Sequence, residues 1–321
     1  MLKWITAASA CVLAACGNPA SESVTEGVQS SSQGAASWAI APEGDLNEFF
    51  ECLESEGAAL VSAHRGGAYP GFPENAIETM AAIMADVPAI MEIDVAASAD
   101  GVLYLMHDDT LERTTTGIGE ADALAWAEIK KLRLEDNEGG ETDFAPPRFA
   151  DVLRWANGRT LLQVDFKPSA SYEDVADEIN RQNAEDSVIL IAYSMASAAK
   201  LRRLLPDAMI SLSVNSQSEL NRAVAAGVPA DRLMGFTGVE APRPRLFSTL
   251  NSRDVEVIFG TLGGRDSIDN EIARSGEEER YAEIAAAGVD IIATDRPKEA
   301  HAALAEAGRA PENGVCGVSR R

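Results

Sequence analysis

The sequence predicts an α/β fold, a (β/α)8 TIM-type barrel with a small cap insertion after its first hairpin. Eight apolar runs are strand candidates, and seven of the intervals between them contain a helical pattern. The runs are 58–63, 89–95, 160–166, 187–193, 208–214, 231–236, 255–261 and 289–294. Strand and helix alternating eight times is typical of a parallel barrel, whose active site lies at the C-terminal ends of the strands. Reactive side chains stand at several of these ends, which agrees with that placement.

The N-terminus has the pattern of a processing segment. A short apolar stretch follows Lys3, and Leu13-Ala14-Ala15-Cys16-Gly17 resembles the lipobox of bacterial lipoproteins. We therefore expect residues 1–15 to be a lipoprotein signal peptide and Cys16 to be the lipidated residue. The protein would then be anchored by lipid to the membrane of the bacterial cell envelope and face the periplasm. An ordinary secretory signal with a chance cysteine is the alternative.

Residues 16–37 are rich in small and polar residues and predict a flexible tether. The barrel is expected over 38–310, with its cap insertion at about 109–148, where the strand spacing breaks. The cap contains a short helical piece from Glu128 to Leu134. The alternative for this insertion is a solvated loop without a role in binding.

The charge balance limits the possible partners. The chain has 27 basic and 51 acidic residues, a net charge of −24, which opposes nucleic-acid binding. Most of these charges are expected to form a solubilising surface. An anionic small molecule would need cations placed locally, and no protein partner is implied. No stretch of about 18 apolar residues indicates an internal membrane span.

The first strand candidate ends in a reactive loop. It leads into His64-Arg65-Gly66-Gly67, in which the glycines allow a tight turn. Pro73-Glu74-Asn75 then opens a helical pattern, since proline is tolerated in the first helical turn. The helix N-terminus is expected to point at this loop.

The second strand candidate supplies two carboxylates. Glu92 and Asp94 project from one face, because side chains two apart on a strand share a side. Asp100-Gly101 is a hairpin signal, and the returning arm leads into His107-Asp108. This arm is too closely connected to be a parallel neighbour, so it should lie above the rim. Antiparallel pairing puts His107 opposite Glu92 or Ile93.

These short motifs resemble those of the glycerophosphodiester phosphodiesterase family. The matches are His64-Arg65-Gly66, Pro73-Glu74-Asn75, Glu92-Ile93-Asp94, Asp100-Gly101, His107-Asp108, Thr110-Leu111 with Arg113-Thr114-Thr115, Val164-Asp165-Phe166-Lys167, and the closing strand from Val289 to Pro297. The resemblance spans roughly residues 58–300. It implies hydrolysis of a small-molecule glycerophosphodiester to an alcohol and glycerol 3-phosphate.

The resemblance also assigns roles to residues. The two catalytic histidines map to His64 and His107, and the phosphate-facing residues to Arg65 and Lys167. The metal ligands map to Glu92, Asp94 and Asp165. Carboxylate oxygens suit a hard divalent cation, Ca²⁺ or Mg²⁺, and imidazole titrates near neutrality, which suits acid-base catalysis.

The sequence departs from the family pattern at three places. Asp165 stands where the family usually has glutamate, and Ala76 replaces a threonine. The strand from Val255 to Gly263 lacks the usual tryptophan, so the alcohol pocket is expected to differ. Tyr69 and Phe72 are candidates to line that pocket or to pack under the cap.

Other interpretations remain open at this stage. Asp165 and Lys167 could form a salt bridge only, and a barrel glycosidase could use Glu92 with Asp94, although such pairs come from facing strands about 5 Å or more apart. A non-catalytic envelope lipoprotein that binds phosphodiesters is the other alternative. His301 is expected on the surface of the last helix.

The last two cysteines of the chain could form a disulfide. Export leads to an oxidising compartment, and both ends of a closed barrel meet at its bottom face. We therefore hypothesise a Cys52–Cys316 disulfide. The alternative is two unpaired cysteines, because the tail 311–321 has the composition of a loosely ordered segment.

Overall fold

The computed structural model describes residues 36–321. The predicted signal peptide, the lipidation site Cys16 and nearly all of the predicted tether lie outside the described residues. Within residues 36–321, no helix combines the length and apolar character that a membrane span requires.

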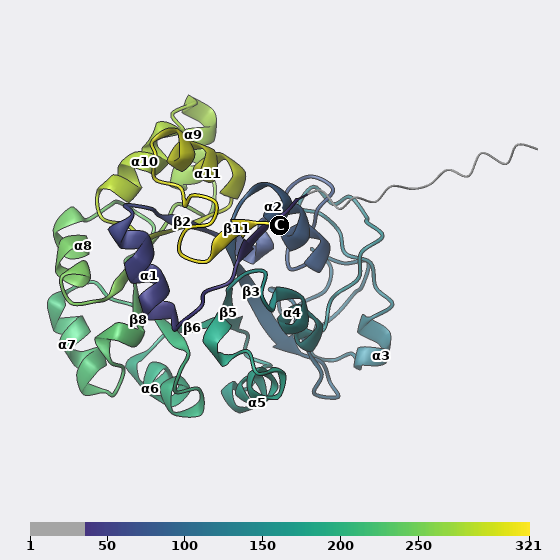
Figure 1. Cartoon of the computed structure of the whole chain (residues 1–321). Coiled ribbons are helices and arrows are strands. Elements are labelled where there is room, and N and C mark those ends of the chain that lie inside the picture. Colours follow the sequence, from purple (N-terminus) through teal and green to yellow (C-terminus); the bar gives the residue numbers. More distant parts are fainter. Residues whose placement is uncertain (1–35) are drawn as a thin grey trace, which may run out of the picture. The chain divides into compact units, whose positions relative to one another are not determined.

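Eight parallel strands close into a barrel, as predicted (Figure 1). They are β2 (Leu60–Ala63), β3 (Ala89–Ala97), β5 (Leu162–Phe166), β6 (Val188–Ala192), β7 (Met209–Ser213), β8 (Leu233–Phe236), β9 (Glu256–Gly260) and β10 (Ile291–Thr294). The barrel closes because β2 pairs in parallel with both β3 and β10. All eight strand candidates of the sequence are strands of this barrel.

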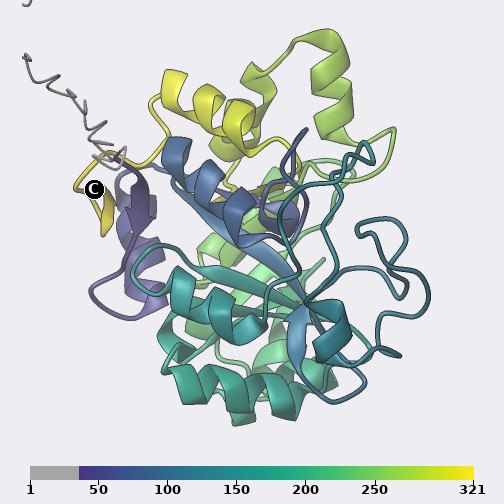
Figure 2. The same cartoon turned by 90° about the vertical axis from the view of Figure 1, so that its right-hand side faces the viewer.

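Helices surround the strands (Figures 1 and 2). They are α2 (Ile77–Asp86), α4 (Phe149–Ala156), α5 (Tyr172–Gln182), α6 (Met195–Leu204), α7 (Gln217–Ala225), α8 (Pro244–Asn251), α9 (Ile268–Ser275), α10 (Glu279–Ala286) and α11 (Pro297–Glu306). Four of them begin directly after a serine whose hydroxyl accepts a backbone N–H of the first turn: Ser171, Ser194, Ser216 and Ser267. Such caps satisfy N–H groups that a helix cannot bond internally.

The core has two layers that follow the alternation along each strand. Outward-facing residues such as Val61 and Ile93 pack against the surrounding helices. Inward-facing residues such as Leu60 and Ile90 fill the barrel, and helix α1 (Leu46–Ser55) covers the bottom with Phe49 and Phe50. The next inward-facing positions of β3 after Ile90 are Glu92 and Asp94, which lie at the C-terminal mouth of the barrel.

Strand β4 (Leu103–Leu105) is the predicted hairpin arm. It runs antiparallel to β3, with Val95 opposite Leu105. Met106 N then donates to Asp94 O at 3.0 Å, which continues this register by one residue. The continued register brings His107 opposite Ile93, one of the two predicted positions.

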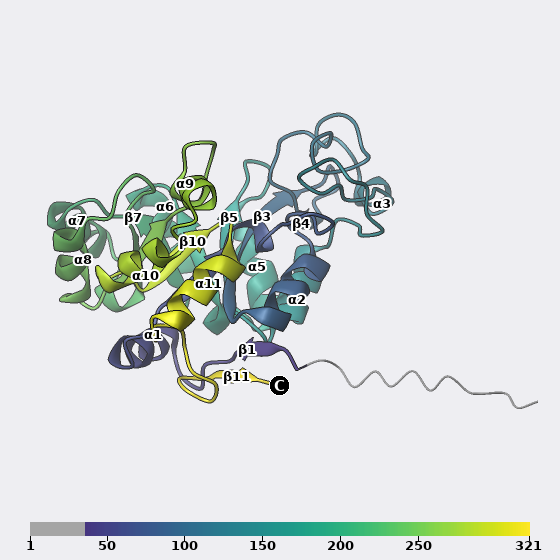
Figure 3. The same ribbon diagram turned by 90° about the horizontal axis from the view of Figure 1, so that it is seen from above.

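The segment between β4 and α4 forms the insertion. It has a small apolar core of its own around Tyr104, Leu111 and Ile129, and Figure 3 shows it beside the end of β3 that is remote from α1. Its helix α3 spans Trp126–Ile129, earlier in the chain than the predicted helical piece 128–134. The N–H of Trp126 donates to Asp100 Oδ1 at 2.8 Å and so ties the helix start to the hairpin turn.

The C-terminal tail is ordered, which contradicts the alternative of a loosely ordered segment with two unpaired cysteines. Strand β11 (Val318–Arg320) pairs antiparallel with β1 (Trp38–Ile40), and Cys52 and Cys316 form a disulfide with Cα atoms 5.8 Å apart. The disulfide hypothesis is therefore confirmed. These short strands carry almost no periodic signal, because three residues are too few to show one.

His301 is not the surface residue that we predicted. It is half-buried, and its ring meets the ring of Trp38 edge-on at 6.5 Å between centroids. Burial lowers its pKa. The alanine-rich sequence around it gave no sign that β1 would cover this face of α11.

Candidate active site

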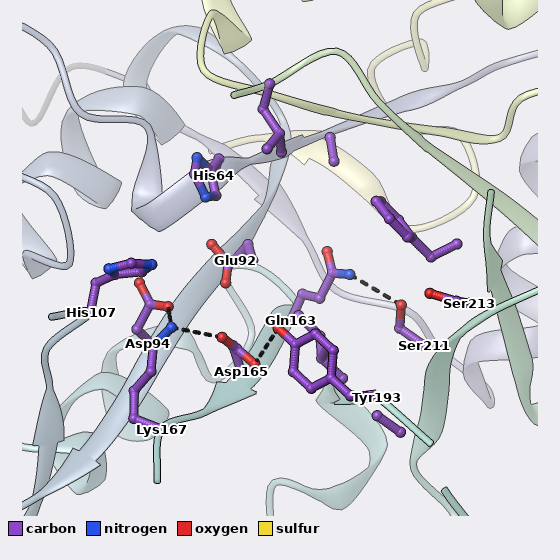
Figure 4. Close-up of a pocket in the computed structure, with 15 residues that line it drawn as sticks. His64, Glu92, Asp94, His107, Gln163, Asp165, Lys167, Tyr193, Ser211 and Ser213 are labelled. Carbon is purple, nitrogen blue, oxygen red and sulfur yellow. Dashed lines mark hydrogen bonds and ion pairs between the residues drawn. The ribbon is translucent and has the colours of Figure 1, made fainter. Parts of the chain in front are cut away.

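Three carboxylates converge at the mouth of the barrel (Figure 4). Glu92 and Asp94 come from β3 and Asp165 from β5, and one oxygen of each lies within 4.8 Å of the others. Strand pairing explains the convergence, because Asp94 lies directly opposite Asp165 in the parallel ladder. The oxygens are closer together than the about 5 Å or more that separates a glycosidase pair. The spacing disfavours the glycosidase alternative.

Lys167 lies between two of these carboxylates. Its Nζ is 2.7 Å from Asp94 Oδ1 and 2.8 Å from Asp165 Oδ2. Burial alone would raise the pKa of Asp94, but the charge of Lys167 and its hydrogen bond outweigh burial and lower it. Lys167 therefore forms the salt bridge considered from the sequence, and it does so while facing the active-site cavity.

The remaining oxygen of Asp94 is held by the first loop. Asn75 Nδ2 donates to Asp94 Oδ2 at 2.7 Å, and Asp94 N donates back to Asn75 Oδ1 at 3.0 Å. This reciprocal pair explains why α2 begins at Ile77 and not at Pro73 as predicted. Asn75 has a φ of +56°, which is not helical, because its side chain is committed to Asp94.

The cluster fits a divalent cation. Three carboxylates face the ammonium of Lys167, and Nε of Arg65 lies 3.9 Å from Asp94 Oδ2, so the carboxylates still outnumber the cations. Oxygen ligands are those that Ca²⁺ and Mg²⁺ take. Burial and then the charge of Asp94 raise the pKa of Glu92 to about 8, and a cation bound beside it would favour its ionised form.

His64 stands at the end of β2 and is oriented by the last barrel strand. Its Nδ1 lies 2.6 Å from Oδ1 of Asp295, which follows β10 directly. Burial opposes protonation of the ring, but the hydrogen bond to Asp295 and the charge of Glu92 outweigh it and raise the pKa of His64. With Nδ1 occupied, Nε2 is the nitrogen left to exchange a proton with a ligand.

His107 has a matching arrangement. Its Nδ1 lies 2.6 Å from Asp108 Oδ1, and Arg113 Nε donates to Asp108 Oδ2 at 2.5 Å. The hydrogen bond from Arg113 lowers the pKa of Asp108 far below its usual range. Arg113 also donates to both oxygens of the buried Glu74, at 2.9 and 2.8 Å. Glu74 thereby ties the first loop to the insertion.

Arg65 occupies a strained position between these groups. Its φ of +51° lies in the left-handed region, and its N–H donates to Glu92 Oε2 at 2.8 Å. One end of the guanidinium donates to Glu74, at 3.0 Å from Nη1 to Oε1. Its Nε is buried, 3.9 Å from Asp94 Oδ2, and has no hydrogen-bond partner in the described part of the chain. A buried donor left unpaired is costly, so Arg65 is set to donate to an anion.

Tyr193 is a residue that the sequence did not point to. It follows β6, and its hydroxyl donates to Asp165 Oδ1 at 2.9 Å although its side chain is largely exposed (Figure 4). No motif marks this contact, which depends on the pairing of distant strands. Asp295, which lies within the closing segment Val289 to Pro297, and Glu74 also gain their roles from folding.

A cavity of about 260 Å³ connects these groups. All three carboxylates, both histidines and Lys167 line it, together with apolar side chains that include Phe236 and Leu262. Tyr69 and Phe72 stack on each other at 4.5 Å between ring centroids, and Phe72 lies near Phe144 of the insertion. These two aromatic residues therefore pack under the insertion, one of the two roles considered for them.

Comparisons with known proteins find a matching family. Residues 64–299 match the model of the glycerophosphoryl diester phosphodiesterase family. The uncharacterized protein YqiK of Bacillus subtilis is 30% identical over 257 residues, covering 76% of this chain and 98% of that protein. Glycerophosphodiester phosphodiesterase 1 of Bos taurus is 38% identical over 111 residues, 35% of this chain and 33% of that protein.

Solved structures share the fold. A glycerophosphoryl diester phosphodiesterase from Parabacteroides distasonis has a TM-score of 0.80 and 29% identity, over 89% of this chain and 100% of that one. An Oleispira antarctica phosphodiesterase, in complex with the product sn-glycerol-3-phosphate, has a TM-score of 0.61 and 17% identity, over 79% of this chain and 99% of that one. At that identity the second likeness concerns the fold.

Proposed function

Because this chain belongs to the glycerophosphoryl diester phosphodiesterase family, and so to the phosphoric diester hydrolases, we propose that it hydrolyses glycerophosphodiesters to an alcohol and glycerol 3-phosphate with the help of a divalent cation. The observation that carries the proposal is one cavity lined by three clustered carboxylates and by two histidines, each of which is paired with an aspartate behind it. The product named for the Oleispira structure supports the same choice of substrate.

Glu92, Asp94 and Asp165 would hold the cation, either Ca²⁺ or Mg²⁺. When bound, it would polarise a phosphoryl oxygen and offset negative charge in the transition state. Asn75 and Tyr193 keep two of the three carboxylates in fixed orientations through their hydrogen bonds. Such outer contacts define the direction in which ligand oxygens point.

Arg65 and Lys167 bind the phosphoryl group. Arg65 brings the unpaired Nε, and Lys167 brings an ammonium already fixed at the cavity wall by Asp94 and Asp165. Both contacts are charge-assisted and shielded from bulk water, which strengthens them. They localise positive charge in a chain whose net charge is −24.

The histidines move protons through Nε2. Neutral His64, with its Nδ1–H donated to Asp295, accepts a proton from the nucleophile at Nε2. Protonated His107, with Nδ1–H donated to Asp108, gives its Nε2 proton to the departing alkoxide. The nucleophile is either water or a hydroxyl of the substrate, which would form a cyclic phosphate first.

Product analysis tests this proposal. The protein is incubated with glycerophosphocholine, with Ca²⁺ or Mg²⁺ or with a chelator, and the phosphorus products are identified by ³¹P NMR. We expect glycerol 3-phosphate with metal and no turnover with the chelator. Choline phosphate as the product, or turnover that survives chelation, would contradict the proposal.

A non-catalytic phosphodiester-binding protein is the second candidate. Asp165 is the observation in its favour, because both of its oxygens already accept protein hydrogen bonds, from Tyr193 and from Lys167. Such a protein would bind glycerol 3-phosphate and glycerophosphodiesters without converting them. Calorimetric binding combined with a lack of turnover at every metal concentration would favour it.

We also propose that Cys16 carries the lipid anchor and that the barrel faces the periplasm. The lipobox-like residues 13–17 support this proposal. Stable attachment then depends on acyl chains, so Cys16→Ser should move the protein to the soluble fraction. A variant that still sediments with the envelope would contradict the anchor.

A further inference from the structure

Asp269 is a buried carboxylate that the proposed chemistry does not use. It lies in the first turn of α9, and only 1% of the residue is exposed. Its backbone N–H donates to Thr261 O at 2.9 Å, which joins the start of α9 to the end of β9. A carboxylate buried to this degree is costly unless its oxygens are hydrogen-bonded. Its partners therefore indicate what it holds in place.

Three donors reach the carboxylate of Asp269. The hydroxyl of Tyr281, a fully buried residue of α10, donates to Oδ1 at 2.7 Å. The hydroxyl of Thr294, the last residue of β10, lies 2.9 Å from Oδ1 and 3.0 Å from Oδ2. The backbone N–H of Asp295 donates to Oδ2 at 2.7 Å. Asp269 therefore holds the chain where β10 ends and where the partner of His64 begins.

The side chain of Asp295 is not fixed by burial, since it is 40% exposed. Its Oδ1 pairs with His64 Nδ1 at 2.6 Å, and its Oδ2 accepts the N–H of Gly263 at 3.0 Å. Gly263 belongs to the short segment between β9 and α9, and the backbone of Asp269 ties the two ends of that segment together. Asp269 thus acts on both sides of Asp295, through its side chain and through its backbone.

The two histidine partners are supported in different ways. Arg113 Nε donates to Asp108 Oδ2 at 2.5 Å, so an arginine fixes the partner of His107. Among residues 36–321, no lysine or arginine forms a salt bridge with Asp295. The direction of the Asp295 carboxylate therefore depends on the Gly263 N–H and on the backbone that Asp269 holds.

We propose that Asp269 is a positioning residue for the reaction and acts on His64 through Asp295. Asp269 does not line the active-site cavity, so it does not contact the substrate. By fixing the backbone of Asp295 it keeps Asp295 Oδ1 in line with Nδ1–H of His64, which leaves Nε2 facing the cavity for proton transfer. This role rests on the proposed function, in which His64 is the base.

Two substitutions of Asp269 separate positioning from bulk. Asp269→Ala removes the acceptor of the Asp295 N–H. Asp269→Asn is the conservative variant, because its amide oxygen can accept that N–H while its NH₂ group faces the Tyr281 hydroxyl. With glycerophosphocholine at saturating Ca²⁺, we expect Asp269→Ala to lower kcat about 10-fold or more and to leave KM within about 2-fold, since a small misplacement of the base costs transition-state stabilisation. Asp269→Asn should recover most of the lost kcat.

NMR gives a readout that does not depend on turnover. The chain has three histidines, so in protein labelled with ¹⁵N-histidine the Nδ1–H signal of His64 can be assigned by its absence in His64→Ala. A proton in a short, charge-assisted hydrogen bond resonates downfield of a free imidazole N–H. In Asp269→Ala this signal should move upfield or vanish through exchange with water, and Asp269→Asn should keep it.

The controls account for lost stability. Asp269→Ala leaves buried donors without partners, which lowers stability. If this variant does not fold, Asp269→Ala is combined with Tyr281→Phe, which removes one of these donors, and is compared with Tyr281→Phe alone. Thr160→Val is the matched control, because the buried Thr160 hydroxyl donates to Ala89 O at the opposite end of the barrel from the mouth. It should melt at a lower temperature but keep kcat and the His64 signal.

An unchanged kcat in Asp269→Ala, or an equal loss of kcat in Thr160→Val, would overturn the positioning role. A loss of kcat with an unchanged His64 signal would also overturn it, because the effect would then not pass through Asp295. If the wild type hydrolyses neither glycerophosphocholine nor bis(4-nitrophenyl) phosphate, the proposed function fails. The NMR signal then still decides whether Asp269 orients the pair of Asp295 and His64.

Discussion

His64 and Asp295 are 231 residues apart in the chain, yet His64 Nδ1 and Asp295 Oδ1 lie 2.6 Å from each other. They meet because β2 and β10 are the first and last strands of the barrel and pair in parallel. The backbone N–H of Asp295 donates to the buried Asp269, which also accepts the hydroxyls of Tyr281 and Thr294. Closure of the barrel therefore fixes the orientation of the His64 ring, which we assign as the general base.

Asp295→Asn should lower kcat/KM about 10²- to 10⁴-fold, because the amide cannot stabilise the imidazolium or hold the correct tautomer. Since burial alone lowers the pKa of His64 and Asp295 raises it, losing this charge should also lower that pKa. A base works above its pKa, so the acidic limb of the pH profile should move to lower pH. Steady-state kinetics across pH measure both effects. An unshifted limb would mean that the limb belongs to another group.

Tyr193→Phe should weaken Ca²⁺ or Mg²⁺ binding about 10-fold, because the hydroxyl orients Asp165, one of the proposed ligands. Isothermal titration calorimetry measures the affinity without turnover. Tyr172→Phe is a suitable control, since this tyrosine packs on Phe166 and does not line the active-site cavity. Equal affinities in wild type and Tyr193→Phe would remove Asp165 from the ligand set or Tyr193 from its support.

The Cys52–Cys316 disulfide should stabilise the barrel by about 2–5 kcal/mol, since it restricts a long loop in the unfolded chain. Cys316→Ser should accordingly lower the melting temperature, and a reducing agent should lower it in the wild type only. Calorimetry at matched protein concentration measures both. Identical melting of oxidised and reduced wild type would show that the bridge contributes no stability.

Glu256→Gln should raise stability at alkaline pH. Burial and then the charge of Asp290 raise the pKa of Glu256, and burial raises the pKa of Asp290 to about 7. Carboxyls with raised pKa values favour the folded state at low pH, and this contribution is lost as pH rises through the folded pKa values. The variant should therefore melt about 2–4 °C higher than wild type at pH 8.5, and the difference should shrink at pH 5. A difference that does not change with pH would contradict the assignment.

The sequence predicted the barrel because its strands are apolar runs at regular intervals, and it predicted the site because the reactive residues fall at strand ends. Glu92 and Asp94 needed only the two-residue alternation, and Asp100-Gly101 gave the register of His107. The contacts of Glu74 with Arg113 and of Tyr193 with Asp165 could not be predicted in this way. They join segments far apart in sequence and carry no periodic signal.

The measurement closest to the central claim compares turnover with metal affinity in His64→Ala and His107→Ala. If the histidines move protons and the carboxylates hold the cation, each variant should lose about 10²-fold or more in turnover while its Ca²⁺ dissociation constant stays near the wild-type value. Glu92→Ala and Asp94→Ala should instead weaken Ca²⁺ binding and recover part of their activity at high Ca²⁺. A dissociation constant that rises in parallel with the loss of turnover in either histidine variant would contradict this account and make that histidine a metal ligand.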